Sequence, residues 1–182
     1  MKYFLVFALL TLQLDCFAQA PDTPMTDVTA KVQLKLKQQV ENEIPVFKKR
    51  LENKKEDTAA IAFRVDTFRV ERFEAKWLAL NYSDYSMKQA TITAAKLYDD
   101  LLNKYYRMLM KTLNAADKKK LVEAQKAWLA YRDSEENLAM AVDNAAYSGG
   151  SIEALGDEAS YLDLIKQRVI MLFNYYEQIN QR

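Results

Sequence analysis

Apolar residues recur every three or four positions through most of the chain, and this period predicts helices. One stripe covers residues 28–51, where Pro45 should kink the helix or start a new one. A second covers 61–80. A third covers 87–113 and is apolar nearly all round in its middle, so we expect it to be the most buried helix. The polar residues between the stripes mark the turns.

Residues that cap helix N-termini precede these stripes, because a short side-chain oxygen can accept from a free amide of the first turn. Ser86 and Gln89 have the spacing of a capping box before the third helix. The expected caps of the other helices are Thr26, then Asp57 or Thr58, and then Asn114.

The last two stripes have the spacing of a two-helix seam. One runs from Leu121 to Ala145 and the other from Leu155 to Ile179. The turn between them, residues 147–151, is short, so the two helices should form an antiparallel pair. We therefore predict an all-α fold, an antiparallel bundle of four to five helices with a long N-terminal helical extension.

Glu135 falls on this seam, where an apolar residue is expected. A buried carboxylate without a partner costs several kcal/mol, so it needs a cation. Arg168 lies on the returning helix at about the right level. We predict that Glu135 or Asp133 pairs with Arg168 across the seam.

Composition narrows the functional classes. The net charge is +1, so nothing points to nucleic acid, and there is no histidine to act as a general base or metal ligand. Adjacent acids, such as Asp99 with Asp100, point about 100° apart on a helix and do not converge on one substrate atom. We therefore expect no catalytic residues, no metal site and no cofactor.

The first residues resemble a secretory signal. Lys2 precedes the largely apolar run 3–12, which is too short to span a membrane, and Cys16-Phe17-Ala18 fits a signal peptidase site. We expect a signal peptide over 1–18, cleavage after Ala18, and a flexible leader over 19–25. The protein would then be secreted or periplasmic, with no transmembrane span.

One stretch carries a recognisable motif. Gln-x-x-Trp-x-x-Tyr-Arg-Asp, at Gln125, Trp128, Tyr131, Arg132 and Asp133, resembles the signature of the lysozyme inhibitor LprI-like family, small exported helical domains of bacteria. The resemblance also includes Asn103, Tyr106, Glu135, the Gly149-Gly150-Ser151 turn and Arg168. It spans roughly 87–172. We expect residues 26–86 to form a helical segment packed with an LprI-like domain over 87–182 as one globular unit.

The resemblance implies a binding protein that inhibits lysozyme or contacts another envelope protein. Many members have cysteines where this chain has Glu136 and Ser160, so their disulfide is absent here. The turn Tyr147-Ser148-Gly149-Gly150-Ser151 is either the partner contact or a plain helix connection whose glycines supply positive φ. The alternative function is an envelope structural or protein-interaction module without inhibitory activity. A net charge of +1 offers no steering toward a basic lysozyme.

Overall fold

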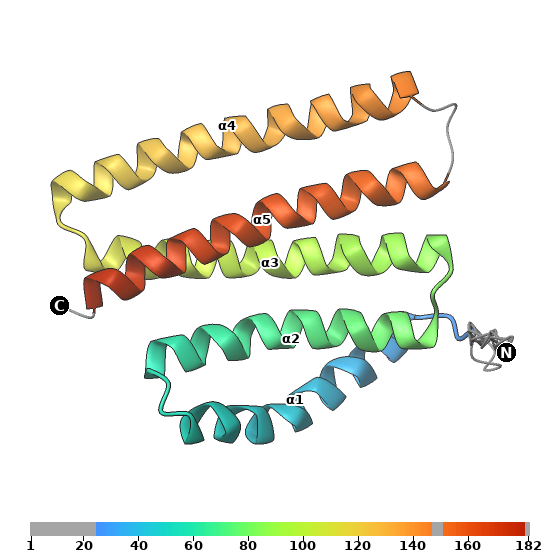
Figure 1. Ribbon diagram of the computed structural model, residues 1–182, viewed down its shortest axis with the longest axis horizontal. Helices are drawn as coiled ribbons and strands as arrows, with labels where there is room; N and C mark the ends of the chain where they lie inside the picture. The colour runs from blue at the N-terminus through green and yellow to red at the C-terminus, as the bar shows by residue number, and fades with distance from the viewer. Residues whose placement is uncertain (1–24, 147–150, 181–182) are drawn as a thin grey trace, which may run out of the picture.

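The computed structural model describes residues 25–146 and 151–180, which form five helices (Figure 1). These are α1 (Ala30–Asn53), α2 (Thr58–Leu80), α3 (Asp84–Thr112), α4 (Ala115–Ala146) and α5 (Ser151–Asn180). The described ranges contain no strand, and successive helices run in opposite directions. The predicted all-α antiparallel bundle, with α1 and α2 as its N-terminal helical extension, is confirmed.

The helices are ordered around α3. Figure 1 shows α3 between α2 and α5, with α1 outside α2 and α4 outside α5. The main core lies where α2, α3 and α5 meet. There Phe63 stacks on Phe173 with ring centroids 4.1 Å apart, and Tyr105 packs edge-on against both rings. Ile165, on α5, is fully enclosed in the same cluster.

Two of the predicted caps are confirmed. Asp57 accepts from the Ala59 amide at 2.7 Å, and Asn114 accepts from the Asp117 amide at 2.9 Å. Each satisfies an amide that has no partner within the helix.

Two other caps were placed wrongly. Thr29, not Thr26, precedes α1, and the Thr26 amide instead donates to the Leu80 carbonyl. Ser83, not Ser86, caps α3, while the hydroxyl of Ser86 accepts from the indole of Trp77 at 2.9 Å. A tertiary contact thus occupies a side chain that the local spacing assigned to a cap.

Pro45 lies inside α1, and Figure 1 shows this helix bending part way along. The proline ring removes one amide donor and crowds the preceding turn, which bends the helix without ending it. The predicted kink is therefore confirmed, and no separate helix begins near Asn42.

A buried acid joins the extension to the rest of the bundle. Asp66, on α2, is 8% exposed and accepts from the Tyr105 hydroxyl of α3 at 2.6 Å. The same carboxylate contacts Lys104 of α3 and lies 3.2 Å from the guanidinium of Arg69. Two cations and a hydroxyl compensate the cost of burying this charge.

Candidate partner-binding site

Two arginine side chains meet at Trp128 in the α4–α5 interface. Arg168, on α5, is 5% exposed, and its Nε donates to Oε1 of Gln125 at 3.0 Å. Its guanidinium carbon lies 5.7 Å from the centroid of the Trp128 ring. Its terminal Nη2 is buried without a hydrogen-bond partner among the described residues. The cation is therefore held by an amide and a ring face.

A second guanidinium meets the same tryptophan. Arg132 lies 5.6 Å from the Trp128 ring centroid and 5.8 Å from that of Tyr161 on α5. It also pairs with Asp133 at 2.6 Å. We call Gln125, Trp128, Arg132, Tyr161 and Arg168 the Trp128 cluster, and it joins the middle of α4 to α5.

The pKa values of the two arginines are shifted in opposite directions. Burial lowers the pKa of Arg168, which has no carboxylate at ion-pair distance among the described residues. Burial would also lower the pKa of Arg132, but the hydrogen bond to Asp133 and nearby charge outweigh it and raise that pKa. Both groups stay charged at neutral pH, because an arginine titrates far above it.

The predicted ion pair between Arg168 and Glu135 or Asp133 is wrong. Arg168 of α5 lies level with Gln125 of α4. Gln125 precedes Glu135 by ten residues on α4. At 1.5 Å per residue, that distance is about 15 Å along the axis, beyond the reach of either side chain. Asp133 instead pairs with Arg132 of its own helix.

The predicted α4–α5 seam is wrong over much of its length. The apolar side of α5, including Ile165, Val169 and Leu172, packs in the core with α3. Beyond Trp128, Leu138 and Val142 of α4 are 56% and 54% exposed. Periodicity gives α5 one apolar face but does not say which neighbour covers it, and α3 offers the wider apolar surface.

The remaining predicted site residues are dispersed. Asn103 donates to the Asp99 carbonyl of its own helix at 3.0 Å, whereas Tyr106 packs against the core. Tyr131 is 51% exposed. The turn residues Tyr147, Ser148, Gly149 and Gly150 lie outside the described residues, and Ser151 begins α5.

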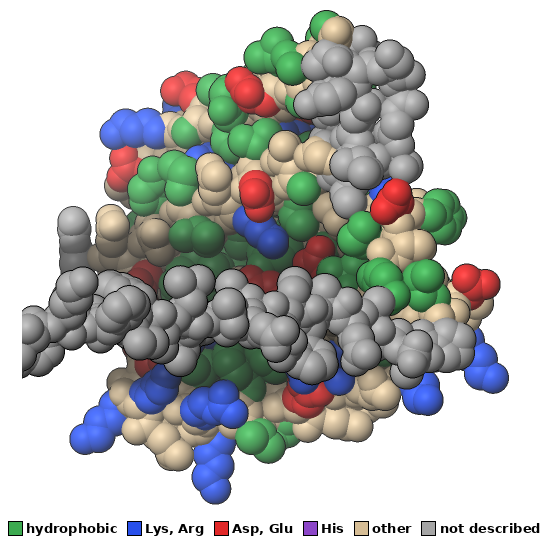
Figure 2. All heavy atoms as spheres, turned by 45° about the vertical axis from the view of Figure 1, so that its right-hand side comes forward, with side chains coloured by type: hydrophobic (Ala, Val, Ile, Leu, Met, Phe, Trp, Pro, Cys, Tyr) green, Lys and Arg blue, Asp and Glu red, His purple; other side chains and the backbone are tan. Residues whose placement is uncertain are grey.

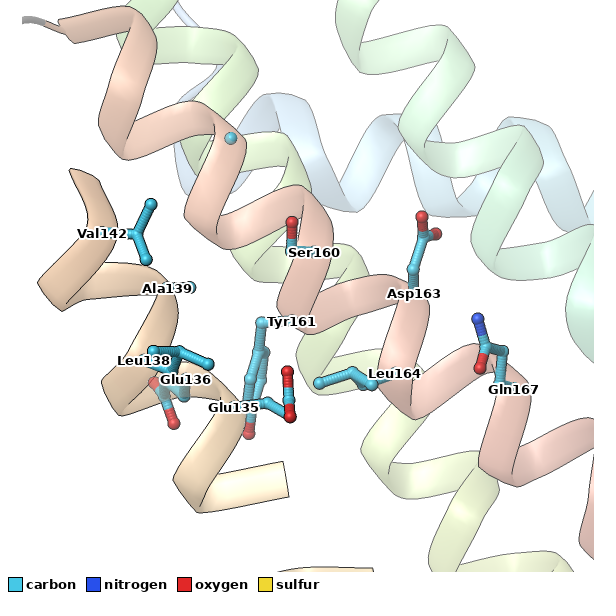
Figure 3. A pocket seen from close by; sticks show the side chains of 11 residues that line it. Glu135, Glu136, Leu138, Ala139, Val142, Ser160, Tyr161, Asp163, Leu164 and Gln167 are labelled. Carbon is cyan, nitrogen blue, oxygen red and sulfur yellow. The ribbon is translucent and has the colours of Figure 1, made fainter. Parts of the chain in front are cut away.

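Past the Trp128 cluster, α4 and α5 border a groove of about 600 Å³ (Figure 3). Figure 3 shows Glu135 and Tyr161 in the space between the helices, with Leu164 reaching toward them. Glu136 and Ser160, the positions where the resemblance places cysteines, also line this groove. Both positions therefore face the open space between the two helices.

Two features of the structure were missed from the sequence. Tyr161 belongs to the Trp128 cluster, and its spacing of seven from Arg168 is a signal that places both on one face of α5. The Asp66 contact with Lys104 and Tyr105 carries no such signal, since partners 38 and 39 residues away follow only from the packing of α2 on α3.

Two kinds of feature, a metal-binding cluster and a membrane-spanning helix, are absent from the described residues. Within residues 25–146 and 151–180, no group of three Asp, Glu, His or Cys side chains has the arrangement to hold a metal ion. None of the helices in the described part of the chain is long and apolar enough to cross a membrane.

The fold and the site define a bundle of five helices with an open groove between its last two. The chain belongs to the family described as Lysozyme inhibitor LprI, whose model matches residues 79–172. The match begins eight residues before the start expected from the motif, in the last turn of α2. No curated protein and no solved structure matches the chain significantly.

Proposed function

We propose that this chain is exported and binds a cell-wall glycosidase of the lysozyme class, which it inhibits without catalysing a reaction. The family match over residues 79–172 carries this proposal, because it covers all of α3 and α4 and most of α5. The Trp128 cluster and the groove both lie within the matched segment.

The sequence of the N-terminus supports export. A basic residue, an apolar run and small residues before Gln19 have the order of a secretory signal. Cleavage after Ala18 would release a mature chain without cysteine, suited to an oxidising compartment without needing a disulfide. Mass spectrometry of the protein recovered outside the cytoplasm should give a chain that begins at Gln19; a retained N-terminus would contradict the cleavage.

Inhibition requires access to a cleft. Lysozyme cleaves a glycosidic bond with two carboxyl groups that flank it, so a protein that covers the cleft excludes the polysaccharide. Residues 147–151 follow α4 in the sequence, and their composition offers one aromatic residue, Tyr147, and two serine hydroxyls. This segment remains our proposed contact with the enzyme.

A cell-wall lysis assay tests the function. Purified mature protein should slow lysis by at least one lysozyme type at micromolar concentration, and Tyr147→Ala should weaken the inhibition while leaving the thermal midpoint unchanged. Lysis at the uninhibited rate with every lysozyme type would contradict the proposal.

A second candidate is a protein-interaction module of the envelope without inhibitory activity. Tyr82 and Tyr85, beside the start of α3, are 43% and 75% exposed, and exposed tyrosine is enriched at protein interfaces. If this candidate holds, Tyr85→Ala abolishes binding to an envelope partner, and no lysozyme is inhibited.

A further inference from the structure

Several apolar side chains in the C-terminal half of α4 are exposed to solvent. Leu138, Met140 and Val142 are 56%, 42% and 54% exposed, and Leu138 and Val142 line the groove beside α5. Figure 2 shows hydrophobic side chains interspersed with acidic ones on the upper part of the molecule, where α4 and α5 lie. Leu138 and Val142 lie one helical turn apart on the same face of α4, so together they form an exposed apolar surface that a partner could cover.

The net charge of the sequence around this surface indicates the chemistry of a partner that could cover it. Residues 133–165 contain eight Asp or Glu and no Lys or Arg, so the segment carries −8. Since the whole chain is +1, the remainder carries +9. In Figure 2, many basic side chains lie along the lower edge of the molecule, and others lie at its upper left. The net charge of +1 is therefore the sum of an acidic segment, residues 133–165, and a basic remainder, so the acidic segment can still attract a basic protein.

The groove combines both properties. Leu138, Val142 and Leu164 supply apolar surface, while Glu135 and Glu136 from α4 and Asp163 from α5 supply negative charge. None of these three acids takes part in an ion pair among the described residues. A volume of about 600 Å³ accepts a few side chains of a partner and not a whole helix.

We infer that the groove between α4 and α5 receives a basic surface of the inhibited enzyme, with lysine or arginine side chains against its acids and apolar side chains against Leu138 and Val142. This inference rests on the proposed function and names the surface and partner chemistry for it. It predicts a preference for basic lysozymes over acidic ones, because like charges across the groove disfavour the wrong partner.

A matched pair of charge reversals tests the electrostatic part. Glu136→Lys lies in the groove, whereas Glu123→Lys lies thirteen residues earlier on the same helix; both glutamates are exposed. Binding to a basic lysozyme, measured by titration calorimetry at low salt, should weaken about tenfold for Glu136→Lys, as expected from reversing one charge near a cation in water. Glu123→Lys should stay within about twofold, and the difference should shrink at 1 M salt, where the screening length is about 3 Å.

A second pair tests occupation of the groove. Gly156 lines it, and a Cβ added there would meet nothing within 4 Å. Gly156→Ala should therefore bind like the wild type, while the ring of Gly156→Phe should fill the groove and weaken binding more than tenfold at both low and high salt. The thermal midpoint of each variant, read by circular dichroism, identifies any that fails to fold.

The outcomes separate the two proposals. If the wild type binds and inhibits a basic lysozyme while Glu136→Lys and folded Gly156→Phe match it within twofold, the groove assignment is overturned and the function stands. If the wild type inhibits an acidic lysozyme but binds no basic one, the groove assignment is again overturned and the function stands; if it inhibits no lysozyme of either charge, both are overturned. Sedimentation of the wild type tests a second copy of this chain as the occupant: a dimer dispersed by Gly156→Phe would overturn the inference in favour of self-association.

Discussion

Asp66 offers the sharpest test of how the N-terminal helices are held to the family domain. Its carboxylate accepts from the Tyr105 hydroxyl at 2.6 Å and contacts Lys104, both on α3, and it also pairs with Arg69 on α2. Asp66→Ala removes the single acceptor that all three donors share. We expect this one substitution to weaken the α2–α3 contact and to destabilise the whole bundle.

The magnitude follows from the burial of each partner. Tyr105 is 1% exposed, and a buried hydroxyl left without an acceptor costs about 1–3 kcal/mol. The side chains of Lys104 and Arg69 are each 42% exposed, so they can turn to water and lose at most about 1 kcal/mol apiece. The expected loss is about 3 kcal/mol of unfolding free energy, or about 6–12 °C in thermal midpoint for a domain of this size.

Urea unfolding followed by circular dichroism measures this loss, and two controls apportion it. Tyr105→Phe removes only the hydroxyl and should cost about 1 kcal/mol. Glu41→Ala removes an exposed partner of Arg69 and should cost less than about 1 kcal/mol. If Asp66→Ala unfolds within about 0.5 kcal/mol of the wild type, the contact does not hold the helices together. Two separate transitions in the wild type would contradict the single globular unit predicted from the sequence.

Three further predictions concern other parts of the bundle. Gly156→Ala should stabilise the protein by about 0.5–1 kcal/mol in urea unfolding, because a helical glycine without crowding gains from a side chain. Arg168→Met should cost about 1–3 kcal/mol by leaving the buried Gln125 oxygen without a donor, whereas the double change to Gln125→Leu and Arg168→Met should recover most of that loss. Burial is the main reason that the pKa values of Tyr98 and Tyr105 are raised, and the acid that accepts from each hydroxyl raises them further: Glu71 for Tyr98 and Asp66 for Tyr105. Because the unfolded tyrosines ionise near about pH 10 and the folded ones do not, this stability is complete below that pH and falls as the pH rises above it, with a shallower fall in Tyr98→Phe.

The predictions from sequence were correct where a feature depends only on residues within one helix or next to it. The period of apolar residues predicted five helical stretches, and Asp57 and Asn114 cap α2 and α4 as expected, because a cap interacts only with the first turn that follows it. The motif at Gln125 and Trp128 likewise identified the family, since it depends on residue types and their spacing alone.

The predictions from sequence were wrong where they concerned which helices pack against each other and in what register. The sequence predicted that Arg168 lies near the level of Glu135 and Asp133, but the register of α4 on α5 places it against Gln125 and Trp128. A shift of a few residues along the axis moves a side chain beyond hydrogen-bond reach, and periodicity does not define that shift.

The amino-acid sequence by itself determined that this protein is helical, where α2 and α4 begin and which family it belongs to, because these depend on contacts within a few turns of chain. Tertiary structure decided that α3 rather than α4 covers the apolar face of α5. That choice leaves Leu138 and Val142 of α4 beside an acidic groove. An apolar stripe identifies the face of a helix that favours burial. Which neighbouring helix covers that face, and how completely, depends on the shape and width of all the other apolar faces together.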